Sequence, residues 1–163
     1  ILGKGRNSCY YDGSDTVSCP PSLGYLLGDE GSGNHIGRCL IKDFFSGCMP
    51  AELASVFSCQ YHISHDAVLD ALYHQPQPNR YLASLASFAI QYSSTPYIQT
   101  LLANVFNAYF QHQVALLSTL TRQLALVGGI AHQFAAQIEA CANQNGYSIV
   151  QIRKALIEPP IKK

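Results

Sequence analysis

The sequence is poor in charge: Asp, Glu, Lys and Arg together make up only 12% of its 163 residues, and the formal net charge is zero. Proteins that bind nucleic acid usually carry a cluster of Lys and Arg, so this balance argues against a nucleic-acid partner. Hydrophobic residues reach 48%, enough for one domain with a core of its own. The low charge also leaves surface that a partner domain can cover.

Long apolar runs and cysteine motifs are missing as well. No stretch approaches the roughly 20 apolar residues of a membrane-spanning helix, and no signal-peptide pattern is visible, so we expect no membrane partner. The six cysteines contain no CxxC pair, which argues against a disulfide framework or a zinc site and favours a reducing, cytoplasmic setting. His62 and His65 lack an accompanying set of carboxylate or cysteine ligands, so we predict no metal site there. No spacing assembles a catalytic triad, and no catalytic residue is assigned.

Short strands and helices succeed one another in a pattern typical of an α/β protein. Asp12-Gly13 lies between two β-forming stretches and predicts a hairpin. An apolar run at 123–127, a helical pattern at 131–143 and a second apolar run at 147–152 predict a parallel crossover unit. Helical periodicity predicts further helices over 34–45, 50–57, 64–73, 79–92 and 97–117.

Three glycine-rich stretches are candidates for ligand binding. Gly3-Lys4-Gly5-Arg6-Asn7-Ser8 can offer backbone N–H groups to a phosphate, or be an ordinary tight turn. Gly28-Asp29-Glu30-Gly31-Ser32-Gly33 precedes a predicted helix with Ser32 or Asn34 as its N-cap; its carboxylates can accept hydroxyl hydrogen bonds or complement the helix dipole. Gly128-Gly129 joins a strand to a helix, where a nucleotide could lie on bare backbone or two elements could pack closely.

These stretches also resemble a known family. The segment 23–33 with Ile36-Gly37 resembles the acidic loop of the N-acetylglucosamine kinases and of the related ATPases that activate benzoyl-CoA reductase and 2-hydroxyglutaryl-CoA dehydratase. The segment 3–8 is similar to the second phosphate loop of this family, and 126–131 resembles its adenosine motif. The resemblance implies the fold of the actin/hexokinase/Hsp70 superfamily, here a ribonuclease-H-like (actin-like ATPase) domain with inserted helices.

By the same resemblance, the chain takes part in transfer of the γ-phosphoryl group of ATP, with Mg²⁺, to a hydroxyl of an amino sugar. Lys4 and Arg6 depart from the family, because cations replace hydroxyl side chains, and Glu30 is expected to support its loop. The residues that would bind ATP are Gly3, Lys4, Gly5, Gly128, Gly129 and Gln133. Those that would bind the sugar are Arg6, Asn7, Ser22, Leu23, Gly24 and Asp29.

The phosphate loop begins at residue 3, so only Ile1 and Leu2 could end the strand that normally precedes it. We therefore expect residues 1–163 to be the C-terminal lobe of a longer protein. The resemblance implies that the N-terminal lobe carries the first phosphate loop and the catalytic aspartate, and a homodimer is one arrangement open to the protein. Two other functions remain open. One is an ATPase that activates a dehydratase or reductase, which would need cysteines that bind an iron–sulfur cluster. The other is a non-catalytic sugar- or nucleotide-binding regulator, favoured by Lys4 and Arg6.

Overall fold

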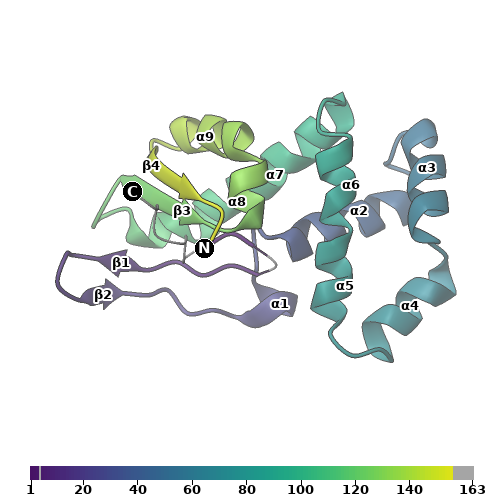
Figure 1. Cartoon of the computed structure of the whole chain (residues 1–163), viewed down its shortest axis with the longest axis horizontal. Coiled ribbons are helices and arrows are strands. Elements are labelled where there is room, and N and C mark those ends of the chain that lie inside the picture. Colours follow the sequence, from purple (N-terminus) through teal and green to yellow (C-terminus); the bar gives the residue numbers. More distant parts are fainter. Residues whose placement is uncertain (4, 156–163) are drawn as a thin grey trace, which may run out of the picture.

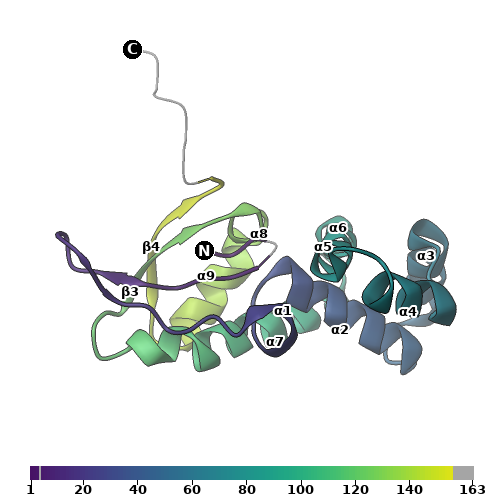
Figure 2. The same ribbon diagram turned by 90° about the horizontal axis from the view of Figure 1, so that it is seen from below.

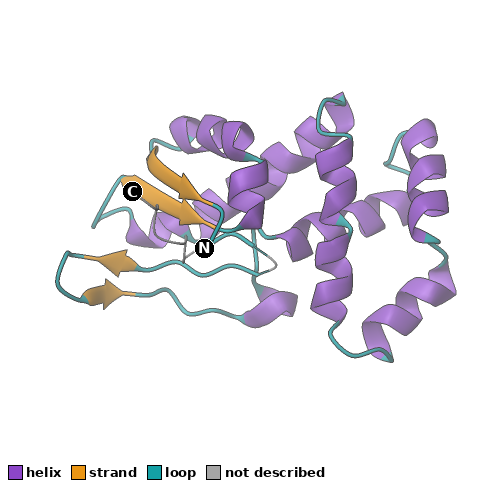
Figure 3. Cartoon of the chain, viewed as in Figure 1, coloured by secondary structure: helices purple, strands orange, loops and turns teal. Residues whose placement is uncertain are grey.

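The computed structural model describes residues 1–3 and 5–155, with the backbone alone at 16–18. The chain is a helix-rich α/β molecule with two small sheets (Figures 1 and 3). Its elements are β1 Tyr10–Tyr11, β2 Thr16–Ser18, α1 Gly24–Leu27, α2 Gly33–Phe45, α3 Ala51–Tyr61, α4 His65–Tyr73, α5 Pro78–Ser84, α6 Ala86–Gln91, α7 Pro96–His112, the 3₁₀ helix η1 Val114–Leu117, β3 Gln123–Val127, α8 Gly129–Gln133, α9 Ala135–Gln144 and β4 Ser148–Arg153.

The two sheets confirm the predicted hairpin and crossover. Strands β1 and β2 are antiparallel, with Tyr10 opposite Ser18. Strands β3 and β4 are parallel, with Gln123 opposite Ser148, and α8 and α9 form the connection between them. In Figure 1 the hairpin runs alongside β3, and the N-terminus lies between the two sheets.

The core is organised around α7, whose Ile98, Leu102 and Phe106 are fully buried. This helix packs against α9 on one side and against α2 on another, and Figure 2 shows it passing below the sheets. Helices α5 and α6 cross the first half of α2, and α3 and α4 lie at its far end (Figure 1). Gly37 permits the closest of these contacts, because a Cβ there would overlap the carbonyl of Leu82 on α5. Within residues 1–3 and 5–155, no helix has both the length and the apolar character needed to cross a bilayer.

Several helix boundaries differ from those predicted. The helix expected over 79–92 is two helices, α5 and α6, which meet at Leu85. The Leu85 N–H donates to the Leu82 carbonyl at 3.1 Å, a tightened turn that redirects the chain. Leu85 is 1% exposed, so burial of this side chain offsets the interrupted helical hydrogen bonding.

Other helices differ in length. The helix expected over 131–143 begins earlier, as α8 at Gly129, and breaks at the buried Phe134 before α9. The helix expected over 97–117 ends at His112 and continues as the 3₁₀ helix η1. The helix expected over 50–57 extends to Tyr61. Periodicity located each of these helices, and tertiary packing set their ends.

Candidate functional site

The glycine loop at residues 3–8 is held between the end of β3 and the start of α2. The Leu2 N–H donates to the Val127 carbonyl at 2.8 Å, and Leu2 pairs with Arg6 across the loop as an isolated antiparallel bridge. The Gly33 N–H, at the first residue of α2, donates to the Gly3 carbonyl at 2.8 Å. The two glycine-rich stretches are therefore in direct contact. Lys4, predicted to bind ATP, lies outside the described residues.

Asp29 joins these two loops through its side chain. Its carboxylate accepts hydrogen bonds from the backbone N–H of Arg6 and from Nδ2 of Asn34, both at 3.3 Å. The Gly5 backbone lies against the same carboxylate, since a Cβ on Gly5 would be 3.2 Å from Oδ2. Asp29 is 7% exposed and has a positive φ of 66°. An ionised carboxylate has about four lone-pair directions, so two remain for a ligand's hydroxyl groups.

Arg6 and Glu30 form a largely buried ion pair beside Asp29. Nε and Nη2 of Arg6 donate to Oε2 of Glu30 at 3.1 and 2.8 Å. The side chains are 2% and 19% exposed. Burial by itself raises the pKa of Glu30, but hydrogen bonds from its own backbone N–H and from Arg6 outweigh burial, and the pKa lies below its usual value. Glu30 thus supports the loop, and the Arg6 guanidinium is directed to it.

The predicted sugar-side segment, Ser22 to Gly24, lies on the surface at the start of α1, and Asn7 is an exposed residue of the glycine loop. Gly24 has a positive φ of 74° and accepts a hydrogen bond from the Gly28 N–H at 2.9 Å. This hydrogen bond joins the predicted sugar-side segment to Gly28, the first residue of the acidic loop.

Two α2 side chains for which the sequence predicted no such role, Arg38 and Asn34, hold α1 in place. Nη1 and Nη2 of Arg38 donate to the carbonyls of Leu26 and Gly28 at 2.8 and 3.2 Å. Nδ2 of Asn34 donates to the Tyr25 carbonyl at 3.0 Å in addition to Asp29. Asn34 is fully buried, and its Oδ1 has no hydrogen-bond partner among the described residues. In the sequence, the place of Asn34 in the first turn of α2 suggested an N-cap and gave no sign that its side chain bonds to Tyr25 and Asp29.

The N-cap of α2 is Ser32, whose Oγ accepts a hydrogen bond from the His35 N–H at 3.2 Å. Nδ1 of His35 in turn accepts from the Gly31 N–H at 3.2 Å. Burial first, and then the nearby positive charge of Arg38, lowers the pKa of His35. The neutral imidazole therefore acts as a hydrogen-bond acceptor that fixes the acidic loop.

Gly128 and Gly129, at the junction of β3 and α8, differ in the space around them. Gly128 has a φ of 134°, and a Cβ there would overlap the backbone carbonyl of Leu2. Gly129 has open space where its Cβ would be. It lines a cavity of about 390 Å³ together with Gly3 and Gln133. The rest of the wall comes from small residues of α5 and α6 (Ala83, Ser84, Ala86 and Ser87) and from Gly33, Ile90 and Ile130.

This cavity brings together three of the residues predicted to bind ATP, which are up to 130 positions apart in the sequence. Two other residues predicted to bind ATP do not line it: Gly128 lies at the junction of β3 and α8 against Leu2, and Gly5 lies against Asp29. The described residues that line the cavity include no carboxylate, so this wall offers no ligand that Mg²⁺ prefers. The small residues of α5 and α6 were not anticipated, because their role depends on how the inserted helices fold back.

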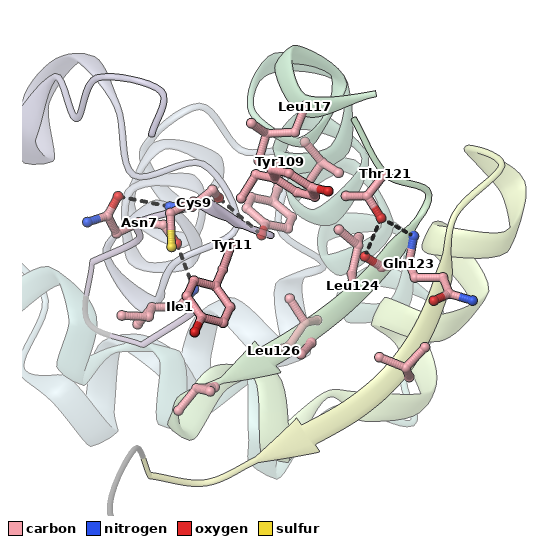
Figure 4. A pocket seen from close by; sticks show the side chains of 16 residues that line it. Ile1, Asn7, Cys9, Tyr11, Tyr109, Leu117, Thr121, Gln123, Leu124 and Leu126 are labelled. Carbon is pink, nitrogen blue, oxygen red and sulfur yellow. Dashed lines mark hydrogen bonds between the residues drawn. The ribbon is translucent and has the colours of Figure 1, made fainter. Parts of the chain in front are cut away.

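A larger cavity of about 530 Å³ lies between the hairpin and β3 (Figure 4). Among the described residues that were predicted to bind a ligand, only Asn7 lines this cavity. Most of its wall consists of apolar side chains and strand backbone. Its size therefore does not mark it as the site for a polar ligand. The smaller cavity, which joins both glycine turns, is the candidate nucleotide site.

Comparisons with known proteins yield a match among solved structures. No family model matches the chain, and neither does any curated protein. A crystal structure from Porphyromonas gingivalis, described as that of a candidate N-acetylglucosamine kinase, matches with a TM-score of 0.90 and 29% sequence identity, over 94% of this chain and 54% of that one. The chain thus spans about half the length of the structure that it matches. The resemblance to N-acetylglucosamine kinases, predicted from three motifs, is confirmed by similarity of structure over nearly the whole chain.

Proposed function

We propose that this chain is the C-terminal, ribonuclease-H-like lobe of an actin-like, ATP-dependent sugar kinase. Its substrate would be N-acetylglucosamine or a related hexosamine, and the cytoplasm would be its setting. One observation carries the proposal: Gly3, Gly129 and Gln133 line a single cavity, and the loop that contains Gly3 is hydrogen-bonded to the loop that contains Asp29. The cavity proposed for the nucleotide and the carboxylate proposed for the sugar hydroxyls would therefore be formed by two loops in direct contact. The match to a sugar-kinase structure supports the same proposal.

In the proposed mechanism this lobe binds and orients ATP and the sugar, and the other lobe supplies the catalytic base. The base or ribose of ATP would lie on Gly129, with Gln133 one turn into α8 and able to donate or accept a hydrogen bond. The Gly3 N–H already donates to the Gly5 carbonyl at 3.0 Å, and the Arg6 N–H to Asp29, so the Gly5 N–H would face the phosphates. The two free lone-pair directions of Asp29 would accept sugar hydroxyls.

The catalytic base and the first phosphate loop would come from the N-terminal lobe. Mg²⁺, when bound with ATP, neutralises phosphate charge. Because no described residue lining the cavity is a carboxylate, the ion would be held by the phosphates and by the opposite lobe. Closure of the two lobes would then exclude water from the sugar hydroxyl that is phosphorylated.

The test is an assay of ADP release by the two-lobed protein, with and without N-acetylglucosamine. We expect ADP release that depends on the sugar. Gly129→Val should raise the KM for ATP about tenfold or more and leave the KM for sugar nearly unchanged, because a branched side chain would enter the nucleotide cavity. Ala136→Val, at an exposed position on α9, is the matched control.

Three results would contradict the proposal or a part of it. Hydrolysis of ATP at the same rate with and without any sugar would favour an ATPase of the kind that activates a dehydratase or reductase. Binding of sugar or nucleotide without turnover by the two-lobed protein would favour a regulator. An equal rise in both KM values in Gly129→Val would show that the glycines serve packing and not nucleotide binding.

A further inference from the structure

Two of the six cysteines lie opposite each other at the open end of the hairpin formed by β1 and β2, the end away from the turn. Tyr10 pairs with Ser18, so one residue further from the turn the antiparallel register places Cys9 opposite Cys19. The irregularity of this hairpin lies on the other side of that pair, between Tyr10 and Tyr11. The hairpin therefore brings together two thiols that are ten positions apart in the sequence.

The side chains of Cys9 and Cys19 are also in contact. The Cys19 thiol is hydrogen-bonded to Cys9, so the two sulfurs lie on the same face of the hairpin. Opposite residues of an antiparallel pair have Cα atoms about 4.5–5.5 Å apart, and a disulfide spans Cα separations of about 4.4–6.8 Å. A bond between the two sulfurs therefore requires no large movement of the backbone.

Both cysteines are accessible to reagents in solution, because both residues are exposed. Cys9 also lines the hairpin side of the larger cavity, where Figure 4 shows its sulfur. Desolvation, and then the neighbouring Cys9, raises the pKa of the Cys19 thiol. Because the thiolate is the reactive form, exchange at Cys19 should become faster as the pH rises from about 7 to about 9.

We propose that Cys9 and Cys19 form a reversible disulfide, which makes the open end of the hairpin a site of redox modification. The oxidant is a small-molecule disulfide such as oxidised glutathione. The thiolate of one cysteine attacks this disulfide, which gives a mixed disulfide and one reduced glutathione. The thiolate of the other cysteine then attacks the protein sulfur of the mixed disulfide and releases the second reduced glutathione. The two protein thiols thus lose two electrons and two protons, and the two glutathione molecules take them up.

The disulfide would fasten the two segments by which the hairpin joins the candidate site. Cys9 directly follows the glycine loop at 3–8, and Cys19 lies three residues before Ser22, where the predicted sugar-side segment begins. The strands β1 and β2 are only two and three residues long, and so short a hairpin is weakly held by its own hydrogen bonds. A covalent bond at its open end restrains the hairpin more strongly than this pairing does.

A disulfide of this kind is compatible with the cytoplasmic setting proposed above. Disulfides in the cytosol are usually transient and sense the redox state, whereas structural disulfides belong to oxidising compartments. The pair would therefore be reduced under ordinary conditions and oxidised when the ratio of oxidised to reduced glutathione rises. The inference needs neither ATP nor a sugar, and it goes beyond the proposed function.

The test is incubation of the folded protein in glutathione buffers of increasing oxidised fraction, followed by alkylation, digestion with trypsin and mass spectrometry. Trypsin cleaves after Arg6 and Arg38, so Cys9 and Cys19 fall in one peptide, residues 7–38, which has no other cysteine. We expect this peptide to resist alkylation and to be about 2 Da lighter than its reduced form, the mass of two hydrogen atoms. Dithiothreitol should reverse both changes. Cys59, which is exposed on α3, is the internal control and should form no disulfide with another cysteine.

Two comparisons show whether the hairpin is the cause. Oγ of Ser8 lies 3.4 Å from the Tyr109 hydroxyl, so the side chain at position 8 is directed to α7 and away from Cys19. In Ser8→Cys combined with Cys9→Ser, the possible loop has nearly the same length, but the folded variant should form mixed disulfides with glutathione instead. In urea, the unaltered protein should need a ratio of oxidised to reduced glutathione at least about tenfold higher for the same fraction of disulfide, because the register no longer holds the two thiols together.

Three results would overturn the proposal. Glutathione attached to both Cys9 and Cys19 in the folded protein would show that the two thiols do not reach each other. Equal disulfide formation in the folded protein, in urea and in the shifted variant would show that the hairpin does not select the pair. A dimer linked through Cys9 or Cys19 in a non-reducing gel would assign these thiols to a contact between two copies. None of these measurements requires turnover, so their outcome is independent of the kinase assay.

Discussion

Asp29 combines three properties that seldom occur together in one residue. It is nearly buried, it has a left-handed backbone conformation, and its carboxylate accepts hydrogen bonds from two different segments. A non-glycine residue with positive φ persists only where the surroundings hold it in place. Here the Arg6 backbone and the Asn34 amide supply that constraint. These contacts hold the Asp29 carboxylate in a fixed position between the two loops.

We predict that Asp29→Asn in the two-lobed protein weakens sugar binding and leaves ATP binding nearly unchanged. A charge-assisted hydrogen bond contributes about 1.5–3 kcal/mol, so sugar affinity should fall roughly ten- to a hundredfold. Calorimetric titration with each ligand separately measures both effects. Asp66→Asn, at a fully exposed side chain, is the control. Unchanged sugar affinity in a folded variant would restrict Asp29 to a structural role in the loop.

His35 should make stability depend on pH. Its pKa is lowered in the folded protein by burial and by Arg38, with His112 adding positive charge and Glu30 opposing the shift. The unfolded chain, with an ordinary pKa of about 6.5, then binds more protons between the folded and unfolded pKa values. The free energy of unfolding should therefore decrease as the pH falls below about 6.5, and be independent of this group at higher pH.

Denaturant unfolding at a series of pH values between 8 and 5 measures this effect. In His35→Asn, whose amide oxygen can still accept from Gly31, the decrease below about pH 6.5 should be smaller than in the unaltered chain. The same change at His65, an exposed side chain, should leave the decrease as it was. Identical pH profiles for the unaltered chain and His35→Asn would contradict the assignment.

At the scale of elements, the junction of β3, α8 and the glycine loop is the tightest point of the site. The Leu2 carbonyl accepts a hydrogen bond from the Ala131 N–H of α8 at 3.2 Å while it lies against Gly128. This close approach places Gly3 and Gly129 on the same cavity wall. The geometry of the candidate nucleotide site therefore depends on the absence of a side chain at Gly128.

Adjacent glycines at this junction should respond differently to alanine. In Gly128→Ala a Cβ would overlap the Leu2 carbonyl at a φ that L-residues rarely adopt, so we expect a loss of at least about 3 kcal/mol in the free energy of unfolding. Gly129→Ala adds a methyl group to open space and should cost less than about 1 kcal/mol. Thermal and urea unfolding of the two variants compares them directly. Equal losses would show that the junction can relax around the added carbon.

At the scale of the whole molecule, we propose that this chain forms one wall of the site and that a second lobe forms the opposite wall. The match to a solved structure over 54% of its length is consistent with this arrangement. Phosphoryl transfer requires groups on both sides of the transferred phosphate.

We therefore predict that the chain from Ile1 to Lys163, purified alone, shows no measurable sugar-dependent release of ADP from ATP. The physical reason is that it lacks the proposed first phosphate loop and catalytic base. A coupled assay with N-acetylglucosamine tests this, and the two-lobed protein is the positive control. Sugar-dependent turnover that co-purifies with the short chain through several columns would show that the chain is sufficient.

The amino-acid sequence alone determined the features that depend on neighbouring residues. Asp12-Gly13 specified the hairpin turn, the apolar run at 123–127 specified β3, and Ser32 was one of two predicted caps for α2. The order of the three glycine-rich motifs predicted the resemblance that the structural match confirms. Turns, caps and periodicity extend over a few residues, and their physical causes are equally local.

Only the tertiary structure decided which distant residues meet. It broke the predicted helices at Leu85 and Phe134, because burial of those side chains outweighed uninterrupted helical hydrogen bonding. It directed Arg6 to Glu30, brought Gly3 to Gly129, and opened a groove between two sheets. Such contacts depend on how whole elements pack, and no spacing in the sequence encodes them.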